Sequence, residues 1–345
     1  MNTSRNISAG TGEKLLVAEG LVRHFRQRRR HLFEATRVVR AVDNINFHLN
    51  TGETLGLVGE SGCGKSTAGR LVLGIDRPTA GTVRFEGIDV VDLPPEEWRA
   101  MRRELQMVFQ DPAGALDPRK SAIDQIREPL AIHAIGSREE RERIVGEICE
   151  AVGLPEATKT RFPHELSGGQ QQRVVIARAL ILKPKLIVCD EPISALDVSI
   201  QAQVVNLLAD LRQKYGLAYL FISHDLKVIR HISDRIAVMY LGEIVETGGR
   251  EELFKTPLHP YTQALISAVP IPDPMRHCDR TILKGDPPSP IDPPSGCRFH
   301  TRCPIARPEC AEKKPEHRPA SSTHSVACHF AQIDAEKKEN ASCTP

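Results

Sequence analysis

The sequence lacks any run of the roughly 18–20 consecutive apolar residues that span a bilayer, and its first residues lack the apolar core of a signal peptide. It lacks a charge excess, because 46 Lys and Arg stand against 44 Asp and Glu, so a nucleic-acid partner is not expected. No repeat recurs at solenoid spacing. With 345 residues, 40% hydrophobic and 26% charged, it excludes disorder and collagen-like fibres. We expect a cytosolic globular protein, long enough for two domains, that is free to dock on a membrane protein.

The apolar pattern predicts strands that alternate with helices. Strands are expected at 41–49, 54–58, 186–189 and 218–222, and helical spacing occurs over 65–73 and 204–211. Such alternation indicates a parallel sheet with both faces covered. The Arg- and Glu-rich segment 98–165 predicts a helical insertion. After residue 256 the sequence is rich in proline, so neither a sheet nor a long helix is expected there.

A phosphate-loop pattern lies between a predicted strand and a predicted helix. Glycines let backbone N–H groups turn inward around phosphate oxygens, and the helix N-terminus favours the anion. Lys65 can reach the outer phosphates, and the Ser66 hydroxyl can ligate Mg²⁺. The alternative, a glycine-rich turn with a chance lysine, does not require the strand and helix around it. The residues of the loop are Gly59, Glu60, Ser61, Gly62, Cys63, Gly64, Lys65 and Ser66.

Two acidic residues end the apolar strand 186–189, at the edge of a parallel sheet where ligands bind. Asp190 can hold the magnesium ion directly or through water, and Glu191 can polarise the attacking water as general base. Two carboxylates that merely terminate a strand are common, but they are not expected beside a phosphate loop.

A second anion site is predicted where a helical run begins. Leu166 is followed by four residues with small side chains or free N–H groups, Ser167, Gly168, Gly169 and Gln170. A single chain has no evident need for two sites of this kind.

Taken in order, these motifs resemble the ATPase subunits of ABC transporters over roughly residues 15–255. The LSGGQ signature at 166–170 carries the resemblance, together with Gln110, the Ser194–Asp197 segment and His224. It implies an α/β P-loop NTPase fold, with a RecA-like core, an antiparallel β subdomain and an α-helical signature subdomain. The implied ATP-binding domain spans 15–256, with its helical subdomain at about 98–170.

The resemblance also implies roles for single residues. In this family two ATPases face head to tail, and each nucleotide lies between one phosphate loop and the partner's signature. Gln110 then corresponds to a residue that senses Mg²⁺ and contacts the membrane partner, so it joins Ser66 and Asp190 at the metal. Asp197 is expected to cross the dimer interface, and His224 to contact the γ-phosphate. Thr67, after the loop, is also expected at the nucleotide.

Phe25 is the candidate for stacking on adenine, because an aromatic face can hold a base with little sequence demand. The basic run at 26–30 lengthens the spacing to the phosphate loop, so a core position for Phe25 stays equally open. For the basic run itself, a solvated loop is favoured over contact with anionic lipid head groups.

Six of the nine cysteines lie from residue 278 onward. Four of them, with the spacing C-x5-C-x6-C-x17-C, are Cys297, Cys303, Cys310 and Cys328. Four thiolates can bind a metal or a cluster, or pair as disulfides. A cytosolic protein disfavours disulfides, and the spacing differs from zinc ribbons, which ranks an iron–sulfur cluster first, zinc second and idle thiols third.

The motif at 257–262 and the prolines at 287–290 resemble the C-terminal extension of oligopeptide and dipeptide importer ATPases, here 257–335. In some members of that family the four cysteines hold a [4Fe–4S] cluster. The resemblance implies a peripheral ATPase on the cytoplasmic face of the inner membrane, with ATP and Mg²⁺. Its implied partners are a homologous ATPase in a heterodimer, two transmembrane permeases and, indirectly, an extracytoplasmic peptide-binding protein.

Three alternatives stay open at this point. The cargo can be nickel, glutathione or another small solute, since related importers share these motifs. A soluble ABC ATPase acting on ribosomes or DNA is disfavoured by the single cassette and the balanced charge. A GTPase or helicase that uses the phosphate loop alone is disfavoured by the signature.

Overall fold

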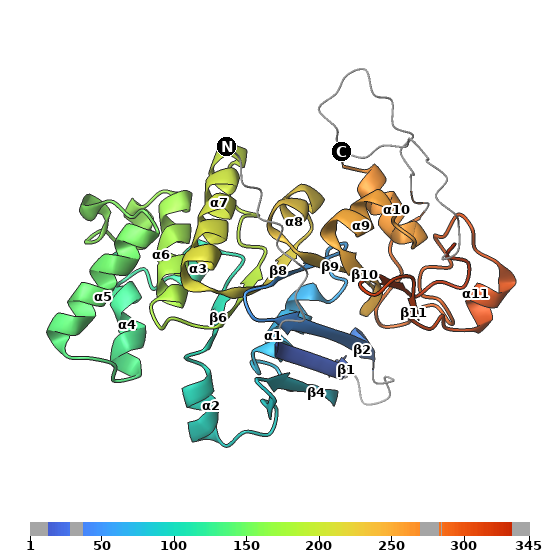
Figure 1. The fold of residues 1–345 in the computed structure, drawn as a ribbon, viewed down its shortest axis with the longest axis horizontal. Helices are drawn as coiled ribbons and strands as arrows, with labels where there is room; N and C mark the ends of the chain where they lie inside the picture. Colours follow the sequence, from blue (N-terminus) through green and yellow to red (C-terminus); the bar gives the residue numbers. More distant parts are fainter. Residues whose placement is uncertain (1–12, 28–36, 270–282, 284, 333–345) are drawn as a thin grey trace, which may run out of the picture.

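The computed structural model describes residues 13–27, 37–269, 283 and 285–332 (Figure 1). The last three arginines of the basic run, Arg28 to Arg30, and two cysteines, Cys278 and Cys343, lie outside these ranges. Within the described part, no helix combines the length and apolar character needed to cross a membrane.

The main sheet has eight strands in the order β11-β12-β10-β9-β3-β8-β7-β6. Five of them, from β9 to β6 in that order, are parallel, as the alternation of strands and helices predicts. The strands β3, β7 and β8 are buried along their whole length, which explains their unbroken apolar sequence. Their bounds are β3 Thr54–Val58, β6 Leu105–Val108, β7 Leu186–Asp190, β8 Ala218–Ser223, β9 Arg235–Tyr240, β10 Glu243–Gly249, β11 Arg318–Pro319 and β12 Ser325–Val326.

A second, antiparallel sheet has the order β2-β1-β4-β5. Its strands are β1 Lys14–Arg26, β2 Val38–Asn50, β4 Ala80–Phe85 and β5 Ile88–Asp89. Leu16, Ile45 and Phe85 from this sheet are buried with Leu71 of α1 (Lys65–Val72) in one core. The core therefore fixes the helix that follows the phosphate loop between the two sheets.

Alternate residues of the central strands serve two different cores. In β7, Val188 packs with the core beside α1, whereas Ile187 and Cys189 pack with the core on the other face. That second core contains apolar side chains of the helices that follow β6, β7 and β8. Those helices are α3 Pro112–Ala115, α4 Ala122–Ile132, α5 Arg138–Ala151, α6 Gly168–Leu180, α7 Val198–Tyr215 and α8 Leu226–Ile232.

The segment 98–170 contains the expected helices, which lie at the left of Figure 1 with α2 (Pro95–Met101) below them. Two 3-10 turns, Glu156–Thr158 and Pro163–Glu165, lead into α6. The segment also contains β6, which the sequence pattern did not reveal. Only four residues pair, and the charged helices around them dominate the local composition.

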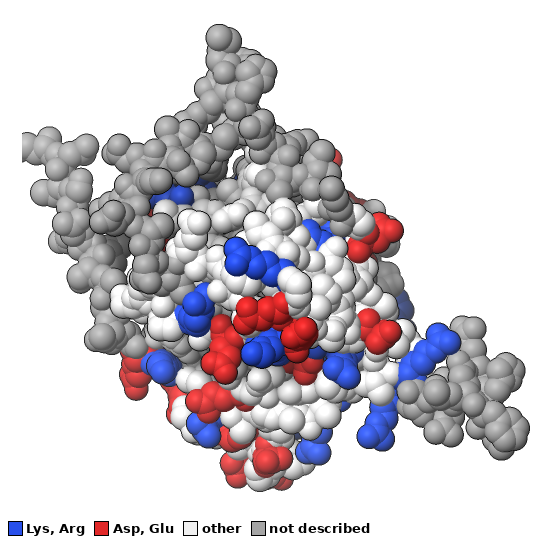
Figure 2. Space-filling view, turned by 90° about the vertical axis from the view of Figure 1, so that its right-hand side faces the viewer, with Lys and Arg blue, Asp and Glu red and all other residues white. Residues whose placement is uncertain are grey.

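The C-terminal segment lies at the right of Figure 1 and follows α9 (Arg250–Lys255). It is less irregular than expected, because α10 (Pro260–Ser267) and α11 (Pro308–Glu312) form and β12 pairs with β10. The expectation of no sheet here was wrong. Proline lacks the N–H that hydrogen bonding between strands needs. Ser325 and Val326 lie beyond the proline run, so their backbone can pair with β10. On this face Figure 2 shows Lys and Arg mixed with Asp and Glu.

Candidate nucleotide site

The phosphate loop joins β3 to α1, as the sequence predicts. Gly64 precedes α1 with φ of 107°, in the left-handed region, and a Cβ there would lie 2.0 Å from the carbonyl oxygen of Ala41. The position therefore accepts glycine alone. Ser61 and Gly62 are exposed, while Gly64, Ser66 and Thr67 are half-buried. The loop thus presents its backbone at the surface while its two ends stay anchored.

Lys65 is buried within the loop. Its ammonium donates to the carbonyl oxygens of Gly59 at 2.8 Å and Glu60 at 3.0 Å, and it lies 4.0 Å from the sulfur of Cys63. Burial raises the pKa of the Cys63 thiol, which the charge of Lys65 opposes. The loop therefore holds one buried cation in position for an anionic ligand.

Ser66 and Asp190 meet at the carboxyl ends of β3 and β7. The Ser66 hydroxyl donates to Oδ1 of Asp190 at 2.8 Å. Burial raises the pKa of Asp190, and the hydrogen bond from Ser66 opposes that shift. A hydroxyl and a carboxylate so placed are hard oxygen ligands of the kind that Mg²⁺ prefers.

Glu191 lies between two other predicted residues. Its Oε2 accepts from the Gln110 amide at 3.1 Å and lies 3.3 Å from Nδ1 of His224. Gln110 follows β6, Glu191 follows β7 and His224 follows β8, so three adjacent strand ends bring the residues together. Glu191 itself has φ of 45°, a strained conformation for a residue with a side chain. Its amide donates to the carbonyl of Ile222 at 3.0 Å, which holds the strained residue in place.

The signature residues begin α6. Ser167 is the N-cap, and its side chain and that of Gln170 form a reciprocal capping box. Ser167 and Gly168 are exposed, so the helix N-terminus faces outward. A Cβ on Gly169 would lie 2.8 Å from Cγ2 of Ile200, in the first turn of α7.

Asp197 is the exposed N-cap residue of α7, and its side chain makes no capping hydrogen bond. Val198 beside it is 82% exposed. Together with the start of α6, these residues form an outward surface distinct from the phosphate loop. Figure 1 likewise places α6 among the helices at the left and α1 against the central sheet.

Phe25 lies in β1 and is half-buried. The guanidinium of Arg23 lies 4.4 Å from the centre of its ring. The position is compatible with a stacking role and with a core role, both of which the sequence left open.

The four clustered cysteines lie in the C-terminal segment, and the seven cysteines that the structure describes are free thiols. The pKa of Cys297 is raised to about 11, mainly by burial, with smaller contributions from Cys310, Cys328 and Cys303. The four thiols are thus close enough to influence one another. Backbone hydrogen bonds to sulfur come from Phe299 to Cys297, from Ile305 to Cys303 and from Phe330 to Cys328.

Among the described residues, no three His, Cys, Asp or Glu side chains converge closely enough to hold a metal ion. The donor set itself, four thiols with backbone N–H groups directed at three of the sulfurs, is one that can serve either a metal ion or a cluster once the thiols are deprotonated.

Two contacts to the phosphate loop were not expected from the sequence. Tyr261 and Arg302, both from the C-terminal segment, bind Glu60 through its backbone and its side chain respectively. Tyr261 belongs to a motif recognised for other reasons, and Arg302 stands beside Cys303. No spacing in the sequence connects either residue to residue 60.

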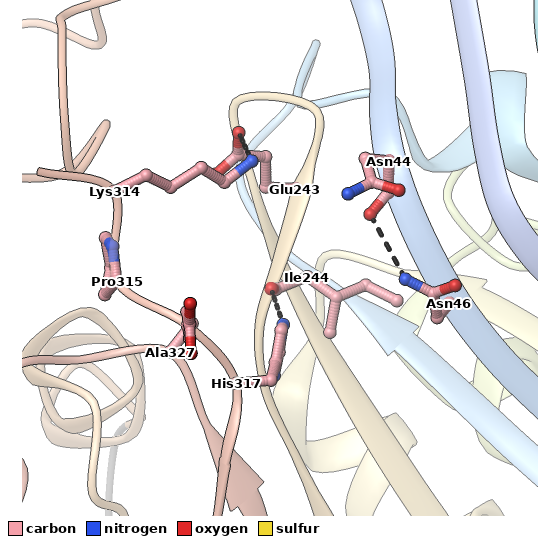
Figure 3. A pocket seen from close by; sticks show the side chains of 9 residues that line it. Asn44, Asn46, Glu243, Ile244, Lys314, Pro315, His317 and Ala327 are labelled. Atoms are coloured by element: carbon pink, nitrogen blue, oxygen red, sulfur yellow. Dashed lines mark hydrogen bonds and ion pairs between the residues drawn. The ribbon is translucent and has the colours of Figure 1, made fainter.

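A cavity of about 420 Å³ lies where the C-terminal segment meets β2 and β10 (Figure 3). Asn44 and Asn46 line one side, and Lys314 and His317 the other. His317 is bonded to the carbonyl of Ile244, and Lys314 to Glu243. None of the predicted nucleotide residues lines this cavity.

Comparison with known families gives two matches along the chain. Residues 42–194 match the model described as ABC transporter. Residues 245–310 match the model described as Oligopeptide/dipeptide transporter, C-terminal region. The first match lies within the sheet-and-helix part and ends after β7, and the second begins in β10 and ends in α11.

Individual relatives extend the similarity over most of the chain. The oligopeptide transport ATP-binding protein AppF of Bacillus subtilis is 54% identical over 85% of this chain and 90% of its own length. The oligopeptide transport ATP-binding protein OppF of Escherichia coli is 54% identical over 86% of this chain and 89% of its own. Among solved structures, the ATP-binding cassette MJ0796, a dimer with bound ADP and Pi, is 31% identical with a TM-score of 0.61. It covers 68% of this chain and 98% of its own.

Proposed function

This chain belongs to the family of ATP-binding proteins of oligopeptide ABC transporters, and we propose that it hydrolyses ATP to drive the import of di- and oligopeptides. The observation that carries the proposal is the set of strand ends at which Ser66 bonds Asp190 and Glu191 lies between Gln110 and His224. These are the positions that a magnesium-bound triphosphate and its attacking water require.

Each side chain then has a distinct task. Lys65 offers a buried positive charge to the outer phosphates, and Ser66 and Asp190 hold Mg²⁺, which neutralises phosphate charge when bound. Glu191 accepts a proton from the attacking water as general base. His224, whose Nδ1 lies 3.3 Å from the same carboxylate, contacts the γ-phosphate. Gln110 donates a hydrogen bond to the Glu191 carboxylate, which holds that side chain in place, and is also one of the ligands of the metal.

The remaining nucleotide contacts come from the loop backbone, from Thr67 and from Phe25 on the adenine side. We propose the stacking role for Phe25 because Arg23 covers one ring face and keeps the ring in place. Replacement of Phe25 by Leu should weaken ATP binding more than binding of inorganic triphosphate, which has no base, if the ring stacks on adenine. Equal weakening of both ligands would assign Phe25 to the core.

Activity requires a second subunit in this proposal. The signature residues 167–170 and Asp197 face outward on a surface apart from the phosphate loop, so they serve the nucleotide of a partner. The exposed Val198 adds apolar area to that surface. We propose a homologous ATPase subunit as the partner, which co-expression and mass measurement of the ATP-bound complex would distinguish from a second copy of this chain.

Two transmembrane permeases and, indirectly, an extracytoplasmic peptide-binding protein complete the assembly, which places this chain on the cytoplasmic face of the membrane. Purification of the intact membrane complex tests this directly. ATP hydrolysis that depends on Mg²⁺ and rises with peptide-loaded binding protein is the expected result. Stimulation by nickel or glutathione instead would change the cargo, and capture of ribosomes without membrane proteins would overturn the transport role.

The chain divides, in this proposal, into an ATP-binding domain at 15–256, with a helical subdomain at about 98–170, and an extension at 257–335. The two family matches support this division, since one falls within each domain apart from the first residues of the second match.

We also propose a [4Fe–4S] cluster on Cys297, Cys303, Cys310 and Cys328, with zinc as the alternative. The mutual influence of the four thiols and the backbone N–H groups aimed at their sulfurs support it. Anaerobically purified protein should contain iron and sulfide at about four of each per chain, with broad visible absorbance. Stoichiometric zinc without iron would favour the alternative. Protein that contains neither iron nor zinc would overturn the proposal.

A further inference from the structure

The part of the C-terminal segment that carries the four clustered cysteines, residues 297–328, is called the cysteine segment below. It contacts the phosphate loop through Arg302. Its Nη1 donates to Oε2 of Glu60 at 2.9 Å and its Nη2 to Oε1 at 3.1 Å, a forked pair between a guanidinium and a carboxylate. The Arg302 side chain is 7% exposed and that of Glu60 is 28% exposed. The pair is therefore largely shielded from solvent and joins residues 242 positions apart.

Helix α10, which precedes the cysteine segment, holds the backbone of Glu60. The Glu60 N–H donates to Oη of Tyr261 at 2.9 Å, and Tyr261 is fully buried. Its ring packs on Tyr240 with centroids 4.7 Å apart, and both rings pack on Phe299 of the cysteine segment. The guanidinium of Arg302 lies 5.9 Å from the centre of the Tyr240 ring. One aromatic cluster thus sets the position of both contacts to Glu60.

Glu60 occupies an unfavourable place for a carboxylate. It is the second residue of the phosphate loop, and its carbonyl accepts from the Lys65 ammonium at 3.0 Å. A negative charge beside a site for a polyanion repels the ligand, and shielding from water strengthens that repulsion. Arg302 supplies the compensating positive charge at the side of Glu60 that faces the extension.

We propose that Arg302 is a positioning residue for ATP, which neutralises Glu60 and, with Tyr261, fixes the first turn of the phosphate loop. The proposal rests on the proposed function, because it concerns the same nucleotide site. Through Arg302, the cysteine segment then contributes to the affinity of the phosphate loop for ATP. If the salt bridge served the fold alone, breaking it would lower the melting temperature and leave the dissociation constant of ATP unchanged.

The test compares full-length chains purified anaerobically, with the dissociation constant of ATP measured by calorimetry and KM and kcat measured on the assembled complex. Arg302→Gln keeps a planar polar side chain over Tyr240 but leaves Glu60 unpaired. We expect its Kd and KM for ATP to rise about tenfold, with kcat within about twofold of the wild type. Arg302→Lys keeps the positive charge but cannot form the forked pair. Its Kd and KM for ATP should lie between those of the wild type and of Arg302→Gln.

The decisive variant is the double replacement Arg302→Gln with Glu60→Gln. It removes the uncompensated charge, so the Kd for ATP should return to within about threefold of the Glu60→Gln single variant. Arg307→Ala, an exposed arginine of the same segment that lies over Phe330, is the matched control and should leave Kd unchanged. Melting temperatures of all variants report whether the fold is intact.

The results separate the two levels of the proposal. If the wild type binds no ATP and Lys65→Ala changes nothing, the proposed function fails. If the wild type binds ATP and Arg302→Gln binds it equally well, or if Glu60→Gln does not restore binding, Arg302 is a structural tie and the inference is wrong. Should Arg302→Gln fail to fold, Arg302→Met, which removes the charge but keeps a long side chain over Tyr240, gives the same comparison in the presence and absence of Glu60→Gln.

Discussion

Oε2 of Glu191 lies 3.3 Å from Nδ1 of His224, across the ends of two adjacent parallel strands. The same oxygen accepts the Gln110 amide, so one carboxylate oxygen is held from both sides. The hydrogen bond from the Glu191 amide to the carbonyl of Ile222 holds its strained backbone in place. This arrangement fixes the position of the proposed general base.

Replacement of Glu191 by Gln should leave ATP binding intact and slow hydrolysis about 100-fold or more, because the amide keeps the hydrogen bonds but cannot accept the proton of water. Binding is measured by calorimetry and turnover by phosphate release. Glu147→Gln, on the exposed face of α5, is the matched control. Near-normal turnover in Glu191→Gln would remove the general-base role.

Gly169→Ala tests the outward face of the signature. Alanine favours a helix over glycine, but its Cβ would lie 2.8 Å from Cγ2 of Ile200 and push the start of α6 away from α7. We expect about tenfold slower hydrolysis with unchanged ATP binding to the isolated chain, and recovery to within about threefold when Ile200→Ala is added. In Gly146→Ala, whose Cβ would meet nothing within 4 Å, the rate should not change.

Cys63 gives a chemical probe of the phosphate loop. Burial raises the pKa of its thiol, so the reactive thiolate is scarce at neutral pH and maleimide labelling should be slow and accelerate with rising pH. Bound ATP should slow it further by closing the loop. The labelled peptides are identified by mass spectrometry, with buried Cys149 of α5 as the internal reference. Equal effects of ATP on both cysteines would show general tightening rather than protection at the loop.

The sequence predicted the parallel core because its strands are buried on both faces and therefore apolar without interruption. It also predicted that Asp190 and Glu191 end one of those strands and that the phosphate loop with Ser66 follows another, while the resemblance alone indicated Gln110 and His224. The structure places Ser66 against Asp190 and Glu191 between Gln110 and His224. Adjacent parallel strands end at one edge, so residues after each strand meet without further information.

What the sequence did not reveal depends on contacts between distant segments. The four residues of β6 carry too little periodicity to stand out from charged helices. Pairing of β12 with β10, and of Arg302 with Glu60, is decided by how the C-terminal segment packs against the rest of the chain. A salt bridge across 242 positions leaves no local pattern.

His259 anchors that packing and makes it sensitive to pH. It is buried at the start of α10, where its Nδ1 accepts the N–H of Tyr261 at 3.1 Å. A ring nitrogen that accepts must be unprotonated, so the imidazole is held neutral. Burial lowers the pKa of His259 to about 4, although the charge of Glu246 opposes the shift.

An unfolded histidine has a pKa near 6.5, so between about pH 6.5 and about pH 4 the unfolded chain binds a proton that the folded chain excludes. The free energy of unfolding should therefore fall as the pH decreases through that window, by about 2 kcal/mol from this residue between pH 7.5 and pH 5. His259→Asn keeps an acceptor for the Tyr261 N–H and does not titrate, so its unfolding midpoint in urea should depend less on pH than that of the wild type. His231→Asn, on the exposed side of α8, should retain the wild-type dependence. If His259→Asn and the wild type lose stability in parallel, the acid sensitivity belongs to other groups and His259 is already protonated in the folded chain.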